Sequence, residues 1–100
     1  MNVNGVDIPE GALADFCRRH HVRHSAFFGS ILREDFGSES DVDVLVEFEP
    51  GTRMGLRFFA LERELSELVG RKVDLNTPGV LGRALRDEVT ASALVQYEAA

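Results

Sequence analysis

Apolar and polar residues alternate most regularly over residues 41–48, which read DVDVLVEF. Successive side chains of a strand point to opposite faces, so the apolar members of this segment share one face. They are Val42, Val44, Val46 and Phe48. The pattern predicts a strand over residues 41–48 whose opposite face carries acidic side chains.

Apolar residues spaced three and four apart predict two helices. The first lies over residues 10–20, with Leu13, Phe16 and Cys17 on one side. The second ends at Gly70 as its C-cap and carries a longer apolar stripe. The members of this stripe are Met54, Phe58, Leu61, Leu65 and Leu68.

Shorter patterns complete the order of elements. We expect strands over residues 22–28 and 71–76, and a loop over residues 35–40. Ser30 is expected to begin a helical turn that reaches Arg33. Thr77 and Pro78 suit the N-cap and first turn of a helix that extends to about residue 89. Residues 91–97 fit a helical turn or an edge strand.

Strands that alternate with helices of these lengths indicate an α/β fold, here a two-layer α+β sandwich. The chain of 100 residues is 44% hydrophobic, which allows one modest core, so we expect a single domain over residues 1–100. No run approaches the roughly 18 apolar residues of a membrane span. A lone Cys17 fits a reducing compartment, and we expect a cytoplasmic protein. The net charge of −6 argues against stable binding of nucleic acid.

Three aspartates are the strongest candidates for chemistry. Asp41 and Asp43 project from the same side of their predicted strand, about 7 Å apart along it. Asp74 lies within the next predicted strand, where a charged residue suits a core poorly. Carboxylates gathered in this way repel one another, which calls for solvent or a bound cation. A hard divalent ion such as Mg²⁺ suits oxygen ligands of this kind.

A second candidate lies where the strand over residues 22–28 ends. Gly29 permits close backbone approach, and the N–H groups after Ser30 point outward at the start of a helical turn. Such a turn can hold phosphate, and Arg33 would add a positive charge nearby. Metal-held triphosphate beside a phosphate-binding turn is the arrangement that phosphoryl or nucleotidyl transfer requires.

The combined motif is far more specific than its parts. It reads Gly29-Ser30, then residues 31–40, then Asp41-Val42-Asp43. The chain therefore resembles the minimal nucleotidyltransferases of the DNA polymerase beta-like superfamily. The stretches SDVDVLVEFEP, RKVDLNTP and VQYE also look like that family, so that the resemblance covers about residues 27–97.

The resemblance implies a small mixed sheet flanked by helices and a role for each motif residue. Asp41, Asp43 and Asp74 would coordinate Mg²⁺, and Asp74 would also help to activate the attacking hydroxyl. Gly29 and Ser30, with Arg33, would bind the triphosphate of ATP. Glu34 stands where many relatives have a glycine, which places a carboxylate near the phosphates.

The resemblance also implies a protein partner. Minimal nucleotidyltransferases are associated with HEPN-domain toxins, for which they act as antitoxins, and some transfer AMP to a tyrosine of the toxin. We therefore expect Mg²⁺-dependent transfer of AMP from ATP to a partner protein. Two alternatives stay open, a non-catalytic antitoxin that masks its partner, and nucleotidyl transfer to a small molecule.

Other conspicuous residues have simpler explanations. The spacing of His20, His21 and His24 matches no common ligand pattern, and two of them follow a helix end, where cations are favoured. Phe36 is expected to pack within the fold, with stacking on an adenine as the alternative. The Met54 and Phe59 edge of the second helix could contribute to a partner interface.

Overall fold

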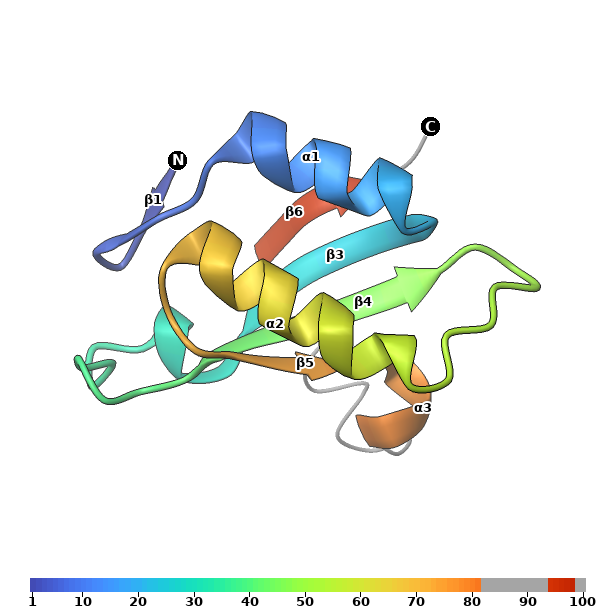
Figure 1. Cartoon of the computed structure of the whole chain (residues 1–100). Coiled ribbons are helices and arrows are strands. Elements are labelled where there is room, and N and C mark those ends of the chain that lie inside the picture. Colours follow the sequence, from blue (N-terminus) through green and yellow to red (C-terminus); the bar gives the residue numbers. More distant parts are fainter. Residues whose placement is uncertain (82–93, 99–100) are drawn as a thin grey trace.

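A four-stranded mixed sheet with the order β5-β4-β3-β6 forms the centre of the molecule (Figure 1). The computed structural model describes residues 1–81 and 94–98. β3 pairs antiparallel with both β4 and β6, whereas β5 pairs parallel with β4. The strands are β3 (Val22–Phe28), β4 (Val42–Phe48), β5 (Val73–Asn76) and β6 (Leu94–Glu98).

Two helices cover one face of this sheet (Figure 1). α1 (Glu10–Arg19) precedes β3, and α2 (Arg57–Val69) connects β4 to β5. A parallel pair of strands requires such a crossover, because a short turn cannot return the chain to the same end of the sheet. A 3₁₀ turn, η1 (Gly29–Leu32), follows β3, and α3 (Pro78–Leu81) follows β5.

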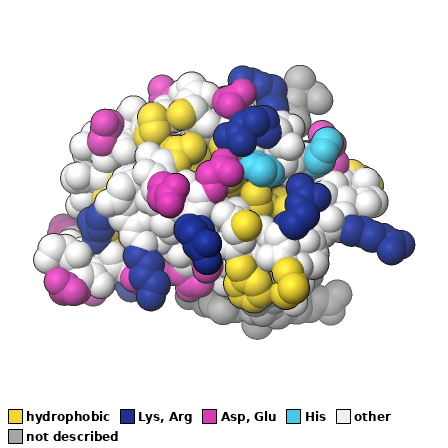
Figure 2. Space-filling view, in the orientation of Figure 1, with side chains coloured by type: hydrophobic (Ala, Val, Ile, Leu, Met, Phe, Trp, Pro, Cys, Tyr) yellow, Lys and Arg dark blue, Asp and Glu magenta, His cyan; other side chains and the backbone are white. Residues whose placement is uncertain are grey.

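The outer surface of the helical layer is polar and carries both signs of charge (Figure 2). Acidic and basic side chains lie close together over α1 and α2, with hydrophobic side chains between them. Of the helices that the structure describes, none is long and apolar enough to cross a membrane.

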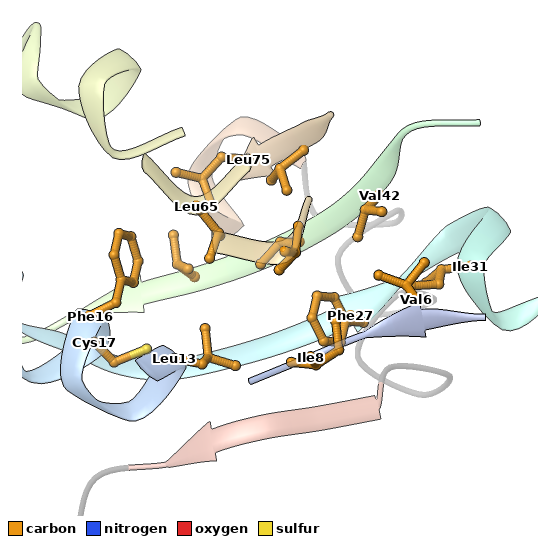
Figure 3. Close-up of a cluster of buried hydrophobic side chains, with 14 of the residues drawn as sticks. Val6, Ile8, Leu13, Phe16, Cys17, Phe27, Ile31, Val42, Leu65 and Leu75 are labelled. Carbon is orange, nitrogen blue, oxygen red and sulfur yellow. The ribbon is translucent and has the colours of Figure 1, made fainter. Parts of the chain in front are cut away.

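The apolar faces of both helices meet the apolar face of the sheet (Figure 3). Phe16 of α1, Leu65 of α2 and Phe27 of β3 are each almost completely buried there. Burial of such a side chain contributes roughly 1.5–3 kcal/mol, so this layer holds the helices on the sheet. The residues that the four-stranded sheet contributes to the same cluster are Val22, Phe27, Val42, Val44, Val46, Val73 and Leu75.

The structure confirms the predicted two-layer α/β fold and most element positions. The tail is a strand, β6, rather than a helical turn. α2 begins at Arg57, because Met54 lies in the preceding turn and its carbonyl accepts the N–H of Arg57 at 3.0 Å. α3 is described as far as Leu81, and the rest of the helix predicted to about residue 89 lies outside the described residues.

A hairpin at the N-terminus was missed by the sequence analysis. β1 (Asn2–Val3) and β2 (Val6–Asp7) pair antiparallel around Asn4 and Gly5, whose φ values are 51° and 89°. An Asn-Gly pair between short apolar runs is a strong hairpin signal, because a two-residue turn of this type needs positive φ at both positions. Val3 and Val6 contribute to the buried cluster, so the hairpin closes one end of the core.

The outer edge of β5 is closed by side chains of α2. The N–H of Val73 donates to Ser66 Oγ at 3.0 Å, and the N–H of Leu75 donates to Glu62 Oε2 at 2.8 Å. Ser66 Oγ also donates to the carbonyl of Glu62 at 2.8 Å. Glu62 and Ser66 lie one helical turn apart, so they match the spacing of alternate N–H groups along the strand. These bonds fix β5 against the helix on the side that no strand of the described residues covers.

Removal of one of these acceptors is expected to weaken the fold. Ser66→Ala leaves the N–H of Val73 without its partner, so the free energy of unfolding should fall by about 1–2 kcal/mol. Urea unfolding followed by circular dichroism measures this change. Glu67→Ala, an exposed substitution on the same helix, serves as the control and should change stability by less than about 0.5 kcal/mol. Equal losses in the two variants would contradict the role assigned to Ser66.

Candidate active site

The register of three neighbouring strands places Phe28, Asp43 and Asp74 in one row across the sheet. Each aspartate lies between two buried apolar residues of its strand that face the helices. Because side chains alternate along a strand, both aspartates point to the face of the sheet opposite α1 and α2. The parallel pairing of β4 with β5 thus brings together two carboxyl groups that are far apart in the chain.

Gly29 lies against Asp43 so closely that no side chain fits between them. Its φ is +74°, in the left-handed region that favours glycine. A β-carbon at this position would lie 3.2 Å from Asp43 Cγ and would collide with Oδ2. The sequence analysis assigned Gly29 to close approach of phosphate. In the structure the group that lies against it is the carboxylate of Asp43.

Ser30 contacts both aspartates of the Asp-x-Asp motif. Its backbone N–H donates to the carboxylate of Asp43, and its Oγ donates to the carbonyl oxygen of Asp41 at 3.4 Å. The turn of η1 and the start of β4 are therefore held together by the two residues of the Gly-Ser pair. The spacing between Gly29 and Asp43 thus serves the packing of η1 against β4 as well as the chemistry proposed for the motif.

The carboxyl group of Asp43 lies in an environment that disfavours its charge. Burial raises its pKa above the ordinary value of 3.8, and the negative charges of Asp74 and Asp41 raise it further. A hydrogen bond with the side chain of Asp74 acts in the same direction, whereas the N–H of Ser30 lowers the pKa. The site thus concentrates negative charge that a cation would neutralise.

Asp41 lies one residue before β4, at the exposed end of the site. Its Oδ2 is 3.9 Å from Nζ of Lys72, an ion pair with little shielding from solvent. Lys72 was not among the predicted site residues, and its place within the stretch RKVD, two residues before Asp74, is the signal that could have suggested it. It adds a positive charge at the open side of the carboxylates.

The residues present suit Mg²⁺ by their chemistry. They are carboxylates on adjacent strands, partly open to solvent, whose mutual repulsion a hard cation would relieve. Within residues 1–81 and 94–98, no group of three or more acidic, histidine or cysteine side chains is placed to hold a metal ion as the side chains stand. The structure brings Asp43 and Asp74 side by side, with Asp41 near them, as an open set of oxygen ligands.

Arg33 and Glu34 follow η1 and are both exposed. Arg33 Nε lies 3.3 Å from Asp35 Oδ1, so its guanidinium is directed to the loop rather than to Asp43 or Asp74. Asn4, which the sequence analysis missed, holds this segment from the hairpin side. Its Nδ2 donates to the carbonyls of Ile31 and Arg33 at 3.0 and 2.8 Å.

Arg71 organises the loop that leads to Asp41. Its Nη2 donates to the carbonyls of Gly37 and Ser40 at 2.8 and 2.7 Å. Its guanidinium also lies over the ring of Phe36, 4.7 Å from the centroid. Phe36 packs against the buried cluster, which confirms the expectation of ordinary packing. No local sequence pattern pointed to Arg71, because the contacts join segments that are distant in the chain.

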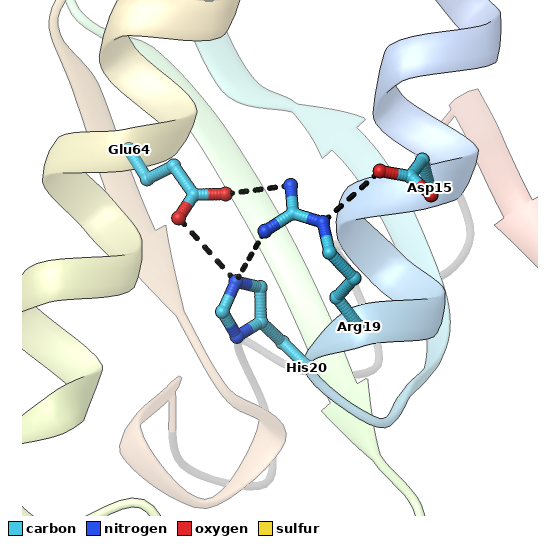
Figure 4. A network of polar contacts seen from close by, with 4 residues as sticks. All are labelled: Asp15, Arg19, His20 and Glu64. Carbon is cyan, nitrogen blue, oxygen red and sulfur yellow. Dashed lines mark hydrogen bonds and ion pairs between the residues drawn. The ribbon is translucent and has the colours of Figure 1, made fainter.

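The histidines lie in structural contacts. His20 Nε2 is 3.4 Å from Glu64 Oε1, within a network between α1 and α2 that includes Arg19 (Figure 4). Arg19 binds Glu64 Oε2 and Asp15 Oδ2 at 3.0 Å each. His21 Nδ1 lies 3.5 Å from Glu49 Oε2. Neither His20 nor His21 joins the aspartate site.

Residues 10–95 match a family model described as the nucleotidyltransferase domain. A protein of Methanocaldococcus jannaschii, named as a proposed protein adenylyltransferase, is 31% identical over 94 residues. The match covers 94% of this chain and 97% of that protein. The agreement therefore extends well beyond the motif residues.

Solved structures agree with the fold. The structure of a proposed minimal nucleotidyltransferase matches with a TM-score of 0.72 and 34% identity, covering 85% of this chain and 86% of that chain. A complex of a tri-AMPylated HEPN toxin with an MNT antitoxin, from Shewanella oneidensis, matches with a TM-score of 0.66. Its identity is 19%, over 89% of this chain and 69% of that chain, so this likeness concerns the fold alone.

The contact between Gly29 and Asp43 generates a prediction about stability. Gly29→Ala forces a side chain into the left-handed region and against the carboxylate, so unfolding should require about 1–3 kcal/mol less free energy. Gly37→Ala is the matched control, because nothing lies within 4 Å of a β-carbon there and its φ is not positive. Thermal and urea unfolding compare the two variants. A Gly29→Ala protein as stable as the Gly37→Ala protein would contradict the close approach.

The raised pKa of Asp43 generates a prediction about pH. The folded state binds this proton more tightly than the unfolded chain, so the group stabilises the fold below pH 3.8, its ordinary pKa. That contribution is lost as the pH rises through the raised folded-state pKa. Asp43→Asn, which does not ionise, should therefore be more stable than the unmodified chain at pH 7 in the absence of divalent ions.

The stability difference should shrink as the pH falls toward 4. Urea unfolding in EDTA across this range measures it, with Glu39→Gln, an exposed loop substitution, as the control. An Asp43→Asn protein that is less stable than the unmodified chain at pH 7 would refute the electrostatic cost assigned to Asp43.

Proposed function

The chain belongs to the nucleotidyltransferase domain family, and we propose that it transfers AMP from ATP to a hydroxyl group of a partner protein. The observation that carries the proposal is the row formed by β3, β4 and β5. There the Gly29-Ser30 turn contacts Asp43, and Asp43 lies beside Asp74. The name of the relative from M. jannaschii supports adenylyl transfer to protein rather than to another acceptor.

In the proposed reaction the acceptor hydroxyl oxygen forms a bond to the α-phosphorus of ATP. The bond from that phosphorus to the bridging oxygen of the β-phosphate breaks, and pyrophosphate leaves. Asp74 takes the hydroxyl proton, since it is the exposed carboxylate of the row. Gly29 and Ser30 position the triphosphate at the turn after β3, and Arg33 contributes positive charge at its outer side.

Asp41, Asp43 and Asp74 would hold Mg²⁺, which is the cofactor we assign to this site. When bound, the ion supplies positive charge to the phosphate oxygens as negative charge develops on them. The burial of Asp43 makes each charge in the site act more strongly than it would in water. Lys72, beside Asp41, is placed to hold the departing pyrophosphate.

The partner we propose is a HEPN-domain toxin, with a tyrosine as the acceptor and this chain as the antitoxin. The supporting observation is the shared fold with the MNT antitoxin that is bound to an AMPylated HEPN toxin. In this proposal residues 1–100 act as one minimal nucleotidyltransferase domain. The acceptor site is then completed by the partner.

A second candidate function is masking of the partner without catalysis. Glu34 favours it, because its exposed carboxylate follows directly on the turn that would receive the triphosphate. In that case the fold would serve as a binding module. The two functions differ in their need for Asp43, which makes them separable.

Intact-mass spectrometry of the HEPN-domain protein, after incubation with this chain, ATP and Mg²⁺, tests the proposal. We expect a gain of one or more AMP groups, and a loss of at least about 100-fold in rate with the double variant Asp41→Ala, Asp43→Ala. EDTA should have the same effect. Glu39→Ala changes an exposed acidic residue of the nearby loop and should keep full activity.

The alternatives give different results. Masking would be established if the partner binds tightly but gains no mass, and if the Asp43→Ala variant of this chain still inhibits it. A mass gain that survives the double variant would contradict the assigned site. Modification of an aminoglycoside-type small molecule in place of the protein would establish the third possibility.

A further inference from the structure

Two large apolar side chains are exposed at the N-terminal end of α2, one in its first turn and one in the residue before it. Leu56 is 84% exposed and Phe59 is 63% exposed, although most apolar residues of the helix are turned to the core. The ring of Phe59 makes an edge contact with the ring of Phe58, 6.2 Å between centroids, and Phe58 in turn packs against the buried cluster. Leu56 and Phe59 therefore leave apolar area in water.

Three arginines lie close to these apolar residues in the chain. Arg53, Arg57 and Arg63 are exposed, and none forms an ion pair with a carboxylate within the part of the chain that the structure describes. Some other exposed arginines do form such pairs, as Arg19 does with Asp15 and Glu64. Several carboxylates of the same segment already have partners, since Glu49 lies against His21, Glu64 binds Arg19 and Glu62 binds the N–H of Leu75. The three guanidinium groups therefore stay available to carboxylates of another molecule.

A shallow pocket adjoins these residues. Its volume is about 350 Å³, and its lining includes Arg53, Arg57, His21 and Thr52. Glu49 also lines it, but the ring of His21 lies against this carboxylate at 3.5 Å. The pocket thus offers the guanidinium groups of Arg53 and Arg57 to an acidic side chain, and Arg57 follows the exposed Leu56 directly in the chain.

The backbone of this region is organised before any partner binds. The N–H groups of Arg57, Phe58 and Phe59 donate to the carbonyls three residues earlier at 3.0 to 3.3 Å. The N–H of Thr52 donates in the same way to Glu49 at 3.1 Å. A surface that is already ordered loses little entropy on binding.

We propose that Arg53, Leu56, Arg57, Phe59 and Arg63 form a docking surface for an acidic segment of a partner protein, with an apolar anchor residue. The carboxylates of the segment pair with the arginines, and its anchor covers Leu56 and Phe59. Charge complementarity selects this occupant, because nucleic acid would be repelled by the rest of this acidic chain. The proposal extends the proposed function by assigning where the acceptor protein is held.

The position of the docking surface suits a macromolecular partner. It lies where β4 ends and α2 begins, whereas Asp43 lies near the other end of β4. The six residues from Asp43 to Glu49 span about 20 Å in an extended strand. Only a partner of protein size contacts the docking surface and reaches the carboxylates at the same time.

Fluorescence anisotropy with two labelled amphipathic peptides tests the charge preference without any need for catalysis. One peptide carries Glu on its polar face and Leu and Phe on the other, and its counterpart carries Lys in place of Glu. At low salt the Glu peptide should bind at least about tenfold more tightly than the Lys peptide. Arg57→Glu should abolish this preference, and Phe59→Ser should weaken binding of the Glu peptide about tenfold.

Arg18→Glu is the matched control, because Arg18 is an exposed arginine of α1 and the substitution changes the net charge equally. Binding of both peptides with equal affinity, no binding of the Glu peptide, or an equal effect of Arg18→Glu would overturn the proposal. Light scattering that shows a dimer of this chain, which Phe59→Ser abolishes, would also overturn the proposal. The surface would then bind a second copy of the chain. Circular dichroism verifies that each variant is folded.

A second measurement connects the docking surface to AMP transfer. Arg57→Glu should raise the KM for the acceptor protein and leave kcat unchanged, since it removes binding and not chemistry. AMP transfer with an unaltered KM would refute the docking of the acceptor while the proposed function stands. Peptide binding as expected, together with a HEPN-domain protein that gains no AMP, would leave the docking surface standing while adenylyl transfer fails.

Discussion

The parallel pairing of β5 with β4 is the constraint on which the rest of this small fold depends. It requires a crossover, and α2 is that crossover, so the helix cannot be removed without losing the strand order. The same helix binds the two outward N–H groups of β5 through Ser66 and Glu62. The register fixed in this way sets Asp74 opposite Asp43. The position of the candidate active site is thus a consequence of how one edge strand is held.

The candidate active site brings together carboxylates that repel one another. Asp43 is partly buried next to two other acidic residues, and its carboxylate fills the space that any side chain at Gly29 would need. On the opposite face of the sheet the apolar residues of both helices are buried, which stabilises the fold. Burial on that face offsets the repulsion between the carboxylates of the site.

The sequence predicted those elements whose periodicity is local. The alternation over residues 41–48 and the stripe that ends at Gly70 both correspond to real elements, and the motif of Gly29, Ser30 and the aspartates identified the family. What it did not predict are contacts between distant segments. Arg71 contacts the loop before Asp41, Asn4 contacts η1 and Ser66 contacts β5. Each is a single polar residue, and nothing beside it in the chain indicates its partner.

The closed edge of β5 has a further consequence for association between chains. An edge strand with free N–H groups can recruit a strand from another molecule, which leads to aggregation. Additional charged side chains on an edge strand often prevent such pairing. In β5 a further charge beside Asp74 would disturb the electrostatics of the candidate active site. Glu62 and Ser66 instead accept the N–H groups of Leu75 and Val73 from the neighbouring helix. The acidic face of β5 stays open to ligands, while these two N–H groups are not available to another strand.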